Sequence, residues 1–192
     1  MATGHESLAV DLEIVEQMVA GMRDYLSSGS VYSKKIDYNL MYLTLGGYLM
    51  RQQRLTELDS TLDASQQVRL RNVAERFDLI RRTQLSAFEK KAGQELQARL
   101  GEWERALREL FDDGRPSMAF YRNDVEKRVM IQALIDTLEA ESADIKPEVL
   151  GKLERLDGQL RARWRLGTFI WPAEFEAAYP ADDYWWLYGE LA

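Results

Sequence analysis

Apolar residues recur every three or four positions along most of this 192-residue chain, which is the spacing of one face of an α-helix. The first such stretch covers residues 7–27 and has an acidic opposite face. A second stretch, residues 33–58, is apolar nearly all round between Ile36 and Met50, which is typical of a helix buried on every side. The pattern therefore predicts two helices in the first third of the chain.

The second predicted helix contains a pair of glycines at its centre. Each glycine in a helix interior costs about 1 kcal/mol relative to alanine, so we expect a structural reason for the pair. Close approach of another helix is one reason, and a kink or a ligand cavity is the alternative. The candidate pocket for such a ligand consists of Tyr38, Tyr42, Gly46, Gly47 and Tyr48.

The longest periodic stretch follows Asp63-Ala-Ser-Gln66, which has the form of a capping box at the start of a helix. Its apolar stripe advances by about 3.6 residues per step, which favours a straight helix over a supercoiled one. Gly93 and Gly101 are possible break points, so residues 66–111 form either one very long helix or a helix pair. The run of residues 112–116 contains Gly and Pro and ends this element.

Two further helices are expected before a tail of different composition. One covers residues 117–142, and the other begins at Pro147, which is a favourable first residue of a helix. The second of these continues to Trp164 as a narrow apolar seam like that of a coiled coil. Residues 168–192 hold eight of the 20 aromatic residues and five acidic residues but no basic residue, and two prolines restrict them to short helical turns and irregular pieces.

The fold class predicted from these patterns is all-α. Residues 1–167 are expected to form an antiparallel bundle of about five helices, including one very long helix or helix pair, with the aromatic tail packed on it. No internal repeat and no low-complexity linker divides the chain. We therefore expect a single domain over residues 1–192.

Composition argues against most catalytic chemistry. The chain has no cysteine and one histidine, His5, and it lacks the common nucleotide-binding and hydrolase motifs. No catalytic, cofactor-binding or metal-ligating residue is assigned, no cofactor is expected, and the protein is not expected to be an enzyme.

The most apolar run, between Lys35 and Arg51, is too short to span a bilayer. A cysteine-free chain without a basic, apolar leader suits the cytoplasm.

The net charge of −7 is unevenly distributed, because the first 28 residues carry −4 and residues 173–192 carry −5. The densest basic segment is Arg161-Ala-Arg163-Trp164-Arg165. On a helix, Arg161 and Arg165 share one face, which makes these three arginines a candidate anion-binding site. A surface face of ion pairs is the alternative, and the negative overall charge disfavours nucleic acid as a partner.

The aromatic tail has two competing interpretations. It either packs on its own bundle and completes the core, or it anchors another chain, including a second copy. The candidate partner-binding residues are Trp171, Tyr184, Trp185, Trp186 and Tyr188.

The function that these features favour is that of a non-catalytic α-helical interaction, assembly or regulatory protein, which binds a protein partner or itself. One alternative is a small-molecule-binding or enzymatic bundle with a site near Gly46-Gly47. Another is a weak nucleic-acid-associated factor that uses Arg161, Arg163 and Arg165. No membrane partner is expected.

Overall fold

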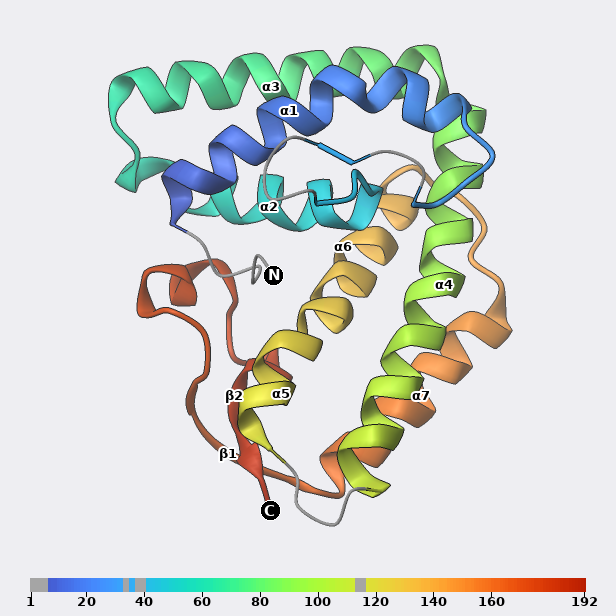
Figure 1. The fold of residues 1–192 in the computed structure, drawn as a ribbon, viewed down its shortest axis with the longest axis vertical. Helices are drawn as coiled ribbons and strands as arrows, with labels where there is room; N and C mark the ends of the chain where they lie inside the picture. The colour runs from blue at the N-terminus through green and yellow to red at the C-terminus, as the bar shows by residue number, and fades with distance from the viewer. Residues whose placement is uncertain (1–6, 33–34, 37–40, 113–116) are drawn as a thin grey trace. The chain divides into compact units, whose positions relative to one another are not determined.

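The computed structural model describes residues 7–32, 35–36, 41–112 and 117–192, which form a mostly helical chain (Figure 1). The chain consists of two compact units, residues 1–95 and residues 96–192, whose boundary falls inside helix α4 (Leu85–Asp112). The described residues contain seven α-helices and one two-stranded sheet, which confirms the predicted all-α class. That the two units form one domain stays a prediction.

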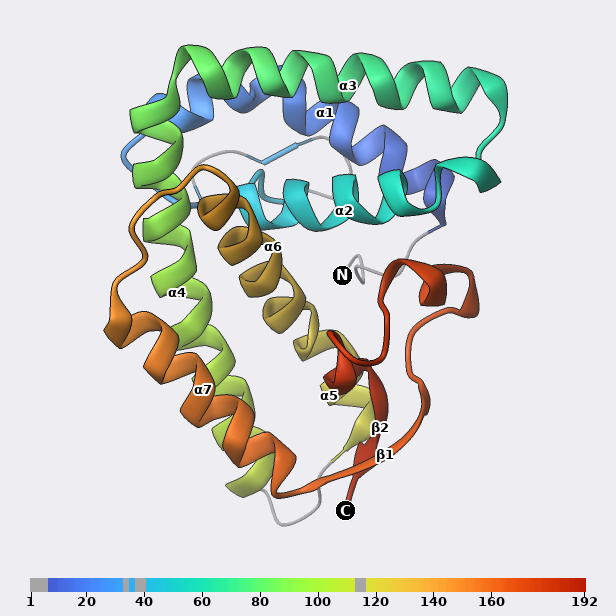
Figure 2. The same ribbon diagram turned by 180° about the vertical axis from the view of Figure 1, so that it is seen from behind.

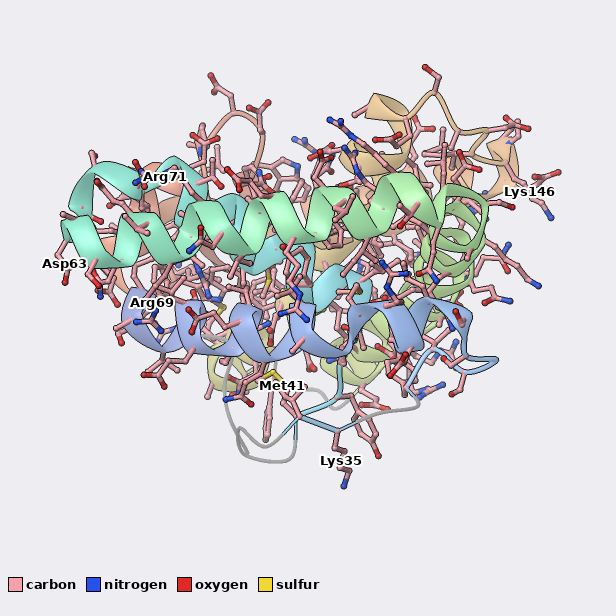
Figure 3. The ribbon with its side chains drawn as sticks, turned by 90° about the horizontal axis from the view of Figure 1, so that it is seen from above. Lys35, Met41, Asp63, Arg69, Arg71 and Lys146 are labelled. Atoms are coloured by element: carbon pink, nitrogen blue, oxygen red, sulfur yellow. The ribbon has the colours of Figure 1, made fainter. Side chains whose placement is uncertain are left out.

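The first unit contains α1 (Leu8–Ser27), α2 (Leu45–Glu57), the short 3-10 helix η2 (Asp59–Thr61), α3 (Ala64–Thr83) and the first turns of α4. α1 packs against both α2 and α3, antiparallel to α2 and parallel to α3 (Figure 1). An ion pair between Glu16 and Arg69 joins the N-terminal halves of α1 and α3. Figure 3 shows Arg69 on the side of α3 that faces α1. The apolar stripe predicted for residues 7–27 provides much of the core, including Leu12, Val15, Val19, Met22 and Leu26.

Helix α2 begins at Leu45, so the prediction of a helix from residue 33 is wrong for the described residues before it. Lys35 and Tyr42 instead form an antiparallel β-bridge. A local contact sets the start of α2 at Leu45. Thr44 is the N-cap of the helix, and its hydroxyl accepts the Gly47 N–H at 3.1 Å. The glycine pair thus occupies the first turn of α2 and not the centre of a helix. A Cβ on Gly47 would come within 2.8 Å of the Thr44 hydroxyl oxygen.

The long apolar stripe forms a helix pair, α3 and α4. Asp63 and Gln66 form the predicted capping box at the start of α3. The chain leaves helical geometry at Gln84 (φ −129°, ψ 37°) and turns sharply there, whereas both glycines considered as break points lie inside α4 (Figure 1). The turn brings the ring centroids of Phe77 and Phe88 to within 6.1 Å of each other, so both helices contribute to one core.

The second unit contains the rest of α4, α5 (Met118–Asp124), α6 (Glu126–Ala140), α7 (Pro147–Arg161) and the C-terminal segment. α5 and α6 cover the predicted fourth helix and meet at Val125. α7 begins at Pro147 as predicted, and its buried residues Leu153, Leu156 and Leu160 belong to the predicted seam. The predicted continuation of this helix to Trp164 is wrong, because α7 ends three residues earlier.

The C-terminal segment contains a small sheet that the sequence did not predict. β1 (Trp164–Phe169) pairs antiparallel with β2 (Tyr188–Leu191), and the 3-10 helices η3 (Ala173–Ala178) and η4 (Trp185–Leu187) lie between them in sequence (Figure 2). The two 3-10 helices agree with the short helical turns predicted for residues 168–192. The strands are joined by a long connection, so no hairpin turn marks them in the sequence.

Candidate interaction edge

Strand β1 has an open edge on the side opposite β2. In the part of the chain that the structure describes, the sheet consists of these two strands. β1 is exposed from Arg165 to Thr168, and the pairing register shifts between Leu166 and Phe169. Arg165 and Leu166 point to opposite faces of the strand, so both of its faces are uncovered at these two residues. An edge of this kind presents backbone N–H and C=O groups that can pair with an added strand.

The register of the sheet decides which backbone groups point to this edge. The Ala192 N–H donates to the Arg163 carbonyl at 2.8 Å. Alternate residues of an antiparallel strand direct their backbone groups to the same side. The Arg163 carbonyl and both backbone groups of Arg165 therefore point toward β2, whereas Trp164 and Leu166 direct their backbone groups toward the open edge.

The side chains of β1 differ between its two faces. Arg165 is 68% exposed and its Nε donates to Glu190 of β2 at 3.1 Å. The Arg163 guanidinium lies on the ring of Phe111, 4.4 Å from its centroid. Leu166, on the opposite face from Arg165, is 73% exposed. The open edge thus has positive charge on one face and an apolar side chain on the other.

Gly189 and Trp164 fix the register of the two strands. Gly189 has a φ of +144°, and a Cβ there would clash with the Arg165 carbonyl oxygen. The Trp164 indole N–H donates to the Tyr188 carbonyl at 3.1 Å, and its ring lies 4.9 Å from that of Tyr121. These contacts hold β1 in place from the β2 side.

The structure separates the three arginines of the predicted anion-binding site. Arg161 is the last residue of α7, and its guanidinium lies over Trp185 at 4.0 Å. Arg163 follows in a turn, and Arg165 belongs to β1. The prediction that Arg161 and Arg165 share a helix face is wrong, because the chain leaves the helix to pair with β2.

The predicted partner-binding aromatics pack within the second unit. Four are buried and the fifth is half-buried: Trp171, Tyr184, Trp185, Trp186 and Tyr188. The Trp171 indole N–H donates to the Arg122 carbonyl at 3.0 Å, and the Tyr121 hydroxyl donates to the Trp186 carbonyl at 2.8 Å. In this structure the tail therefore contributes to the core of its own unit.

Arg128 connects α6 and α7 with this tail. Its guanidinium donates to both carboxylate oxygens of Asp157, at 3.0 and 2.9 Å, and lies 3.7 Å from the centroid of a Trp186 ring. The residue is 3% exposed. The electrostatic attraction in an ion pair or a cation–π contact is stronger where water is excluded than at an exposed site.

The candidate pocket residues do not share one environment. Tyr38 lies outside the described residues. Tyr42 is 46% exposed, whereas Tyr48 is fully buried with its ring 4.3 Å from that of Phe77. Burial raises the pKa of the Tyr48 hydroxyl far above its usual range. Tyr42 is therefore accessible to solvent, whereas Tyr48 lies in the core, and the two do not line one pocket.

Sequence reasoning missed two sets of buried charged residues in the first unit. In one set, Asp11 of α1 binds Arg54 and Arg51 of α2, with the Nε atoms at 2.7 and 3.2 Å from its carboxylate. In the other set, Lys91 and Glu95 of α4 contact the backbone around the ends of α1 and α2. All five are at most 2% exposed, so they hold helices together and do not face solvent. Their position beside apolar stripe residues was the signal available in the sequence.

A shallow hollow of about 540 Å³ follows one face of α7. Its lining mixes apolar and charged residues: Leu150, Leu153, Glu154, Asp157, Gly158 and Arg161.

Among the described residues, no three His, Asp or Glu side chains gather as a metal site would require. Every helix within the described ranges is too short or too polar to cross a lipid bilayer.

Comparison of the chain with models of protein families, with curated proteins and with solved structures found no match.

Proposed function

We propose that this chain is a non-catalytic interaction protein in which the open edge of β1 receives an extended segment of a protein partner. The observation that carries this proposal is the exposure of both faces of β1 at Arg165 and Leu166. The β2 side of the strand is already ordered by Gly189 and Trp164. A preorganised edge loses little conformational freedom on binding, which favours strand addition as the mode of recognition.

A different partner chain fits this edge better than a second copy does. Natural edge strands use charged side chains to prevent pairing with themselves. Two copies joined through β1 would bring the Arg165 side chains of both copies onto one sheet, which is unfavourable because their charges are alike. A partner segment of different charge has no such penalty.

Burial supports a binding role over a catalytic one. Three buried charged residues of the first unit, Asp11, Arg51 and Arg54, are at most 2% exposed, and both arginines pair with Asp11. A substrate would have to open this core to reach them. The absence of cysteine fits a reducing compartment, and we propose the cytoplasm as the place of this role.

Selection of binders from a displayed library of random peptides tests the proposal. The immobilised full chain is compared with Leu166→Pro, which removes an N–H that points to the open edge, and with the matched control Leu166→Val, which keeps it. We expect selected peptides to bind the wild type and L166V alike and L166P at least tenfold more weakly.

The test includes a readout that leaves the protein unchanged. N-methylation of alternate peptide bonds in a selected peptide removes its edge-pairing donors and should abolish binding to the wild type. If no selected peptide responds to L166P or to N-methylation, β1 is not the binding edge.

A further inference from the structure

We infer that the segment received by β1 is an acidic peptide in extended conformation, in which acidic residues alternate with apolar ones. This inference rests on the proposed function and adds the chemistry of the partner. It follows from the charge of β1, from the residues that β1 already accepts on its β2 side, and from the exposed leucine.

The charge near the open edge is positive. Residues 161–169 contain three arginines and no acidic residue. Arg165 belongs to β1, and Arg163 lies in the turn directly before the strand, so both arginines are near the start of the open edge. A strand added beside β1 would place a side chain about 5 Å from Arg165 on the same face, where an acidic residue is favoured and a basic one is not.

The inner edge of β1 provides an example of what the outer edge can accept. Glu190 lies opposite Arg165 in the ladder and pairs with it, and Leu191 lies opposite Trp164. β2 thus presents an acidic residue to the basic face of β1 and an apolar residue to the other face. Arg165 is still 68% exposed with Glu190 bound, so its guanidinium is accessible to a second carboxylate.

The opposite face of β1 determines the alternate positions of the partner. Leu166 is 73% exposed on this face, and it is the last residue of β1 before the register of the ladder shifts between Leu166 and Phe169. An apolar side chain beside Leu166 would remove both surfaces from water. A segment with period-two alternation of acidic and apolar residues therefore satisfies both faces of β1 at once.

Two labelled peptides of equal length test the inference, one with four Glu-Val repeats and one with four Lys-Val repeats. Fluorescence anisotropy with the full wild-type chain should give at least tenfold tighter binding of the Glu-Val peptide at low salt. Raising the salt to about 0.5 M should reduce this preference, because exposed charges are screened. L166P should bind neither peptide.

The double variant R165E/E190R is the matched control for charge. It keeps the ion pair across β1 and β2 and the net charge of the chain, but it places the negative charge on β1. We expect its preference to reverse in favour of the Lys-Val peptide. If circular dichroism shows that it does not fold, Arg163→Gln, which leaves the β1–β2 ion pair intact, should reduce the Glu-Val preference at least threefold.

The two levels of the proposal fail in different ways. If library peptides respond to L166P but the Glu-Val and Lys-Val peptides bind equally, the acidic partner is wrong and strand addition stands. A preference that persists unchanged in R165E/E190R or in R163Q also overturns the acidic partner. If no peptide of either charge or from the library distinguishes L166P from wild type, the proposed function itself is wrong.

Discussion

Lys91 and Glu95 lie one turn apart on α4, and each holds the end of a different helix. The Glu95 carboxylate accepts the N–H groups of Leu45 and Gly46, at 2.7 and 3.0 Å, at the start of α2. The Lys91 ammonium donates to the Ser28 carbonyl at 2.6 Å, just beyond the end of α1. The carboxylate thus faces the positive end of one helix dipole and the ammonium the negative end of another. A single face of α4 fixes both ends of the connection between α1 and α2.

Replacing Glu95 by alanine should destabilise the first unit. The variant leaves two backbone N–H groups of α2 without their carboxylate acceptor, and each buried unsatisfied group costs about 1–3 kcal/mol. We expect a loss of about 3 kcal/mol in the free energy of unfolding, measured by urea denaturation and circular dichroism. Gln94→Ala, at the exposed neighbouring position, is the control and should change stability by less than about 0.5 kcal/mol. Equal effects of the two variants would show that Glu95 does not cap α2.

Asp11→Asn should also destabilise the first unit. Asp11 is the carboxylate between the buried guanidiniums of Arg51 and Arg54, and removing one partner of a buried ion pair costs about 3–5 kcal/mol. The control is Glu13→Gln on the exposed side of the same helix. A midpoint of urea unfolding in D11N that matches that of E13Q would contradict this account.

Two glycines of the second unit should respond to alanine with opposite signs. Gly189→Ala places a Cβ against the Arg165 carbonyl oxygen at a positive φ, so we expect a loss of more than about 2 kcal/mol. Gly158 lies inside α7 with open space around it, so Gly158→Ala should stabilise by up to about 1 kcal/mol. Thermal unfolding of both variants checks the prediction, and a neutral Gly189→Ala would refute the register of the sheet.

Asp136 should make stability fall as pH rises. Its side chain is exposed at the surface, but partial desolvation raises the pKa of its carboxyl above the ordinary 3.8. Glu139 and Asp183 add to the rise, whereas the hydrogen bond from Gln132 and the charge of Arg128 oppose it. The folded protein then holds the proton more tightly than the unfolded chain does. The contribution of Asp136 is therefore fully present below about pH 3.8 and is lost as pH rises through the folded-state pKa.

Asp136→Asn should remove this pH dependence. We expect the variant to be more stable than the wild type at pH 7 and equal to it near pH 3, measured by urea unfolding across the pH range. Asp144→Asn, at an exposed position in the α6–α7 connection, is the control. A stability difference between D136N and wild type that does not change with pH would contradict the raised pKa.

Trp186→Ala tests whether the aromatic tail completes the core of its own unit. Trp186 is 2% exposed and stacks with Arg128, so truncation should cost about 3–5 kcal/mol. Phe120→Ala provides the control, because Phe120 is 71% exposed and its loss should change the melting temperature little. If both variants have the melting temperature of the wild type, the tail does not stabilise the second unit.

The elements with local signals were predictable from the sequence. The stripe of α1, the capping box at Asp63 and the start of α7 at Pro147 all depend on residues within a few positions of one another. The β1–β2 pair does not, because Arg165 and Glu190 are 25 residues apart and Trp164 also fitted the helical seam before it. A helical continuation and a strand were equally compatible with the local pattern there.

The candidate site was predictable in part. The sequence singled out Arg163 and Arg165, but only the pairing with β2 converts them from a helical anion site into an open strand edge. Lys91 and Glu95 have the four-residue spacing of ordinary surface ion pairs. Their burial arises from the turn at Gln84, which brings the first turns of α4 to the ends of α1 and α2.

The boundary between the two units, inside α4, has a spectroscopic consequence. All five tryptophans of the chain lie between Trp103 and Trp186, and therefore in the second unit. Tryptophan fluorescence, excited at a wavelength that tyrosine does not absorb, reports that unit alone, whereas far-ultraviolet circular dichroism reports the helices of both. One unlabelled sample therefore gives two unfolding curves, and the distance between their midpoints measures how strongly the halves of the chain are coupled.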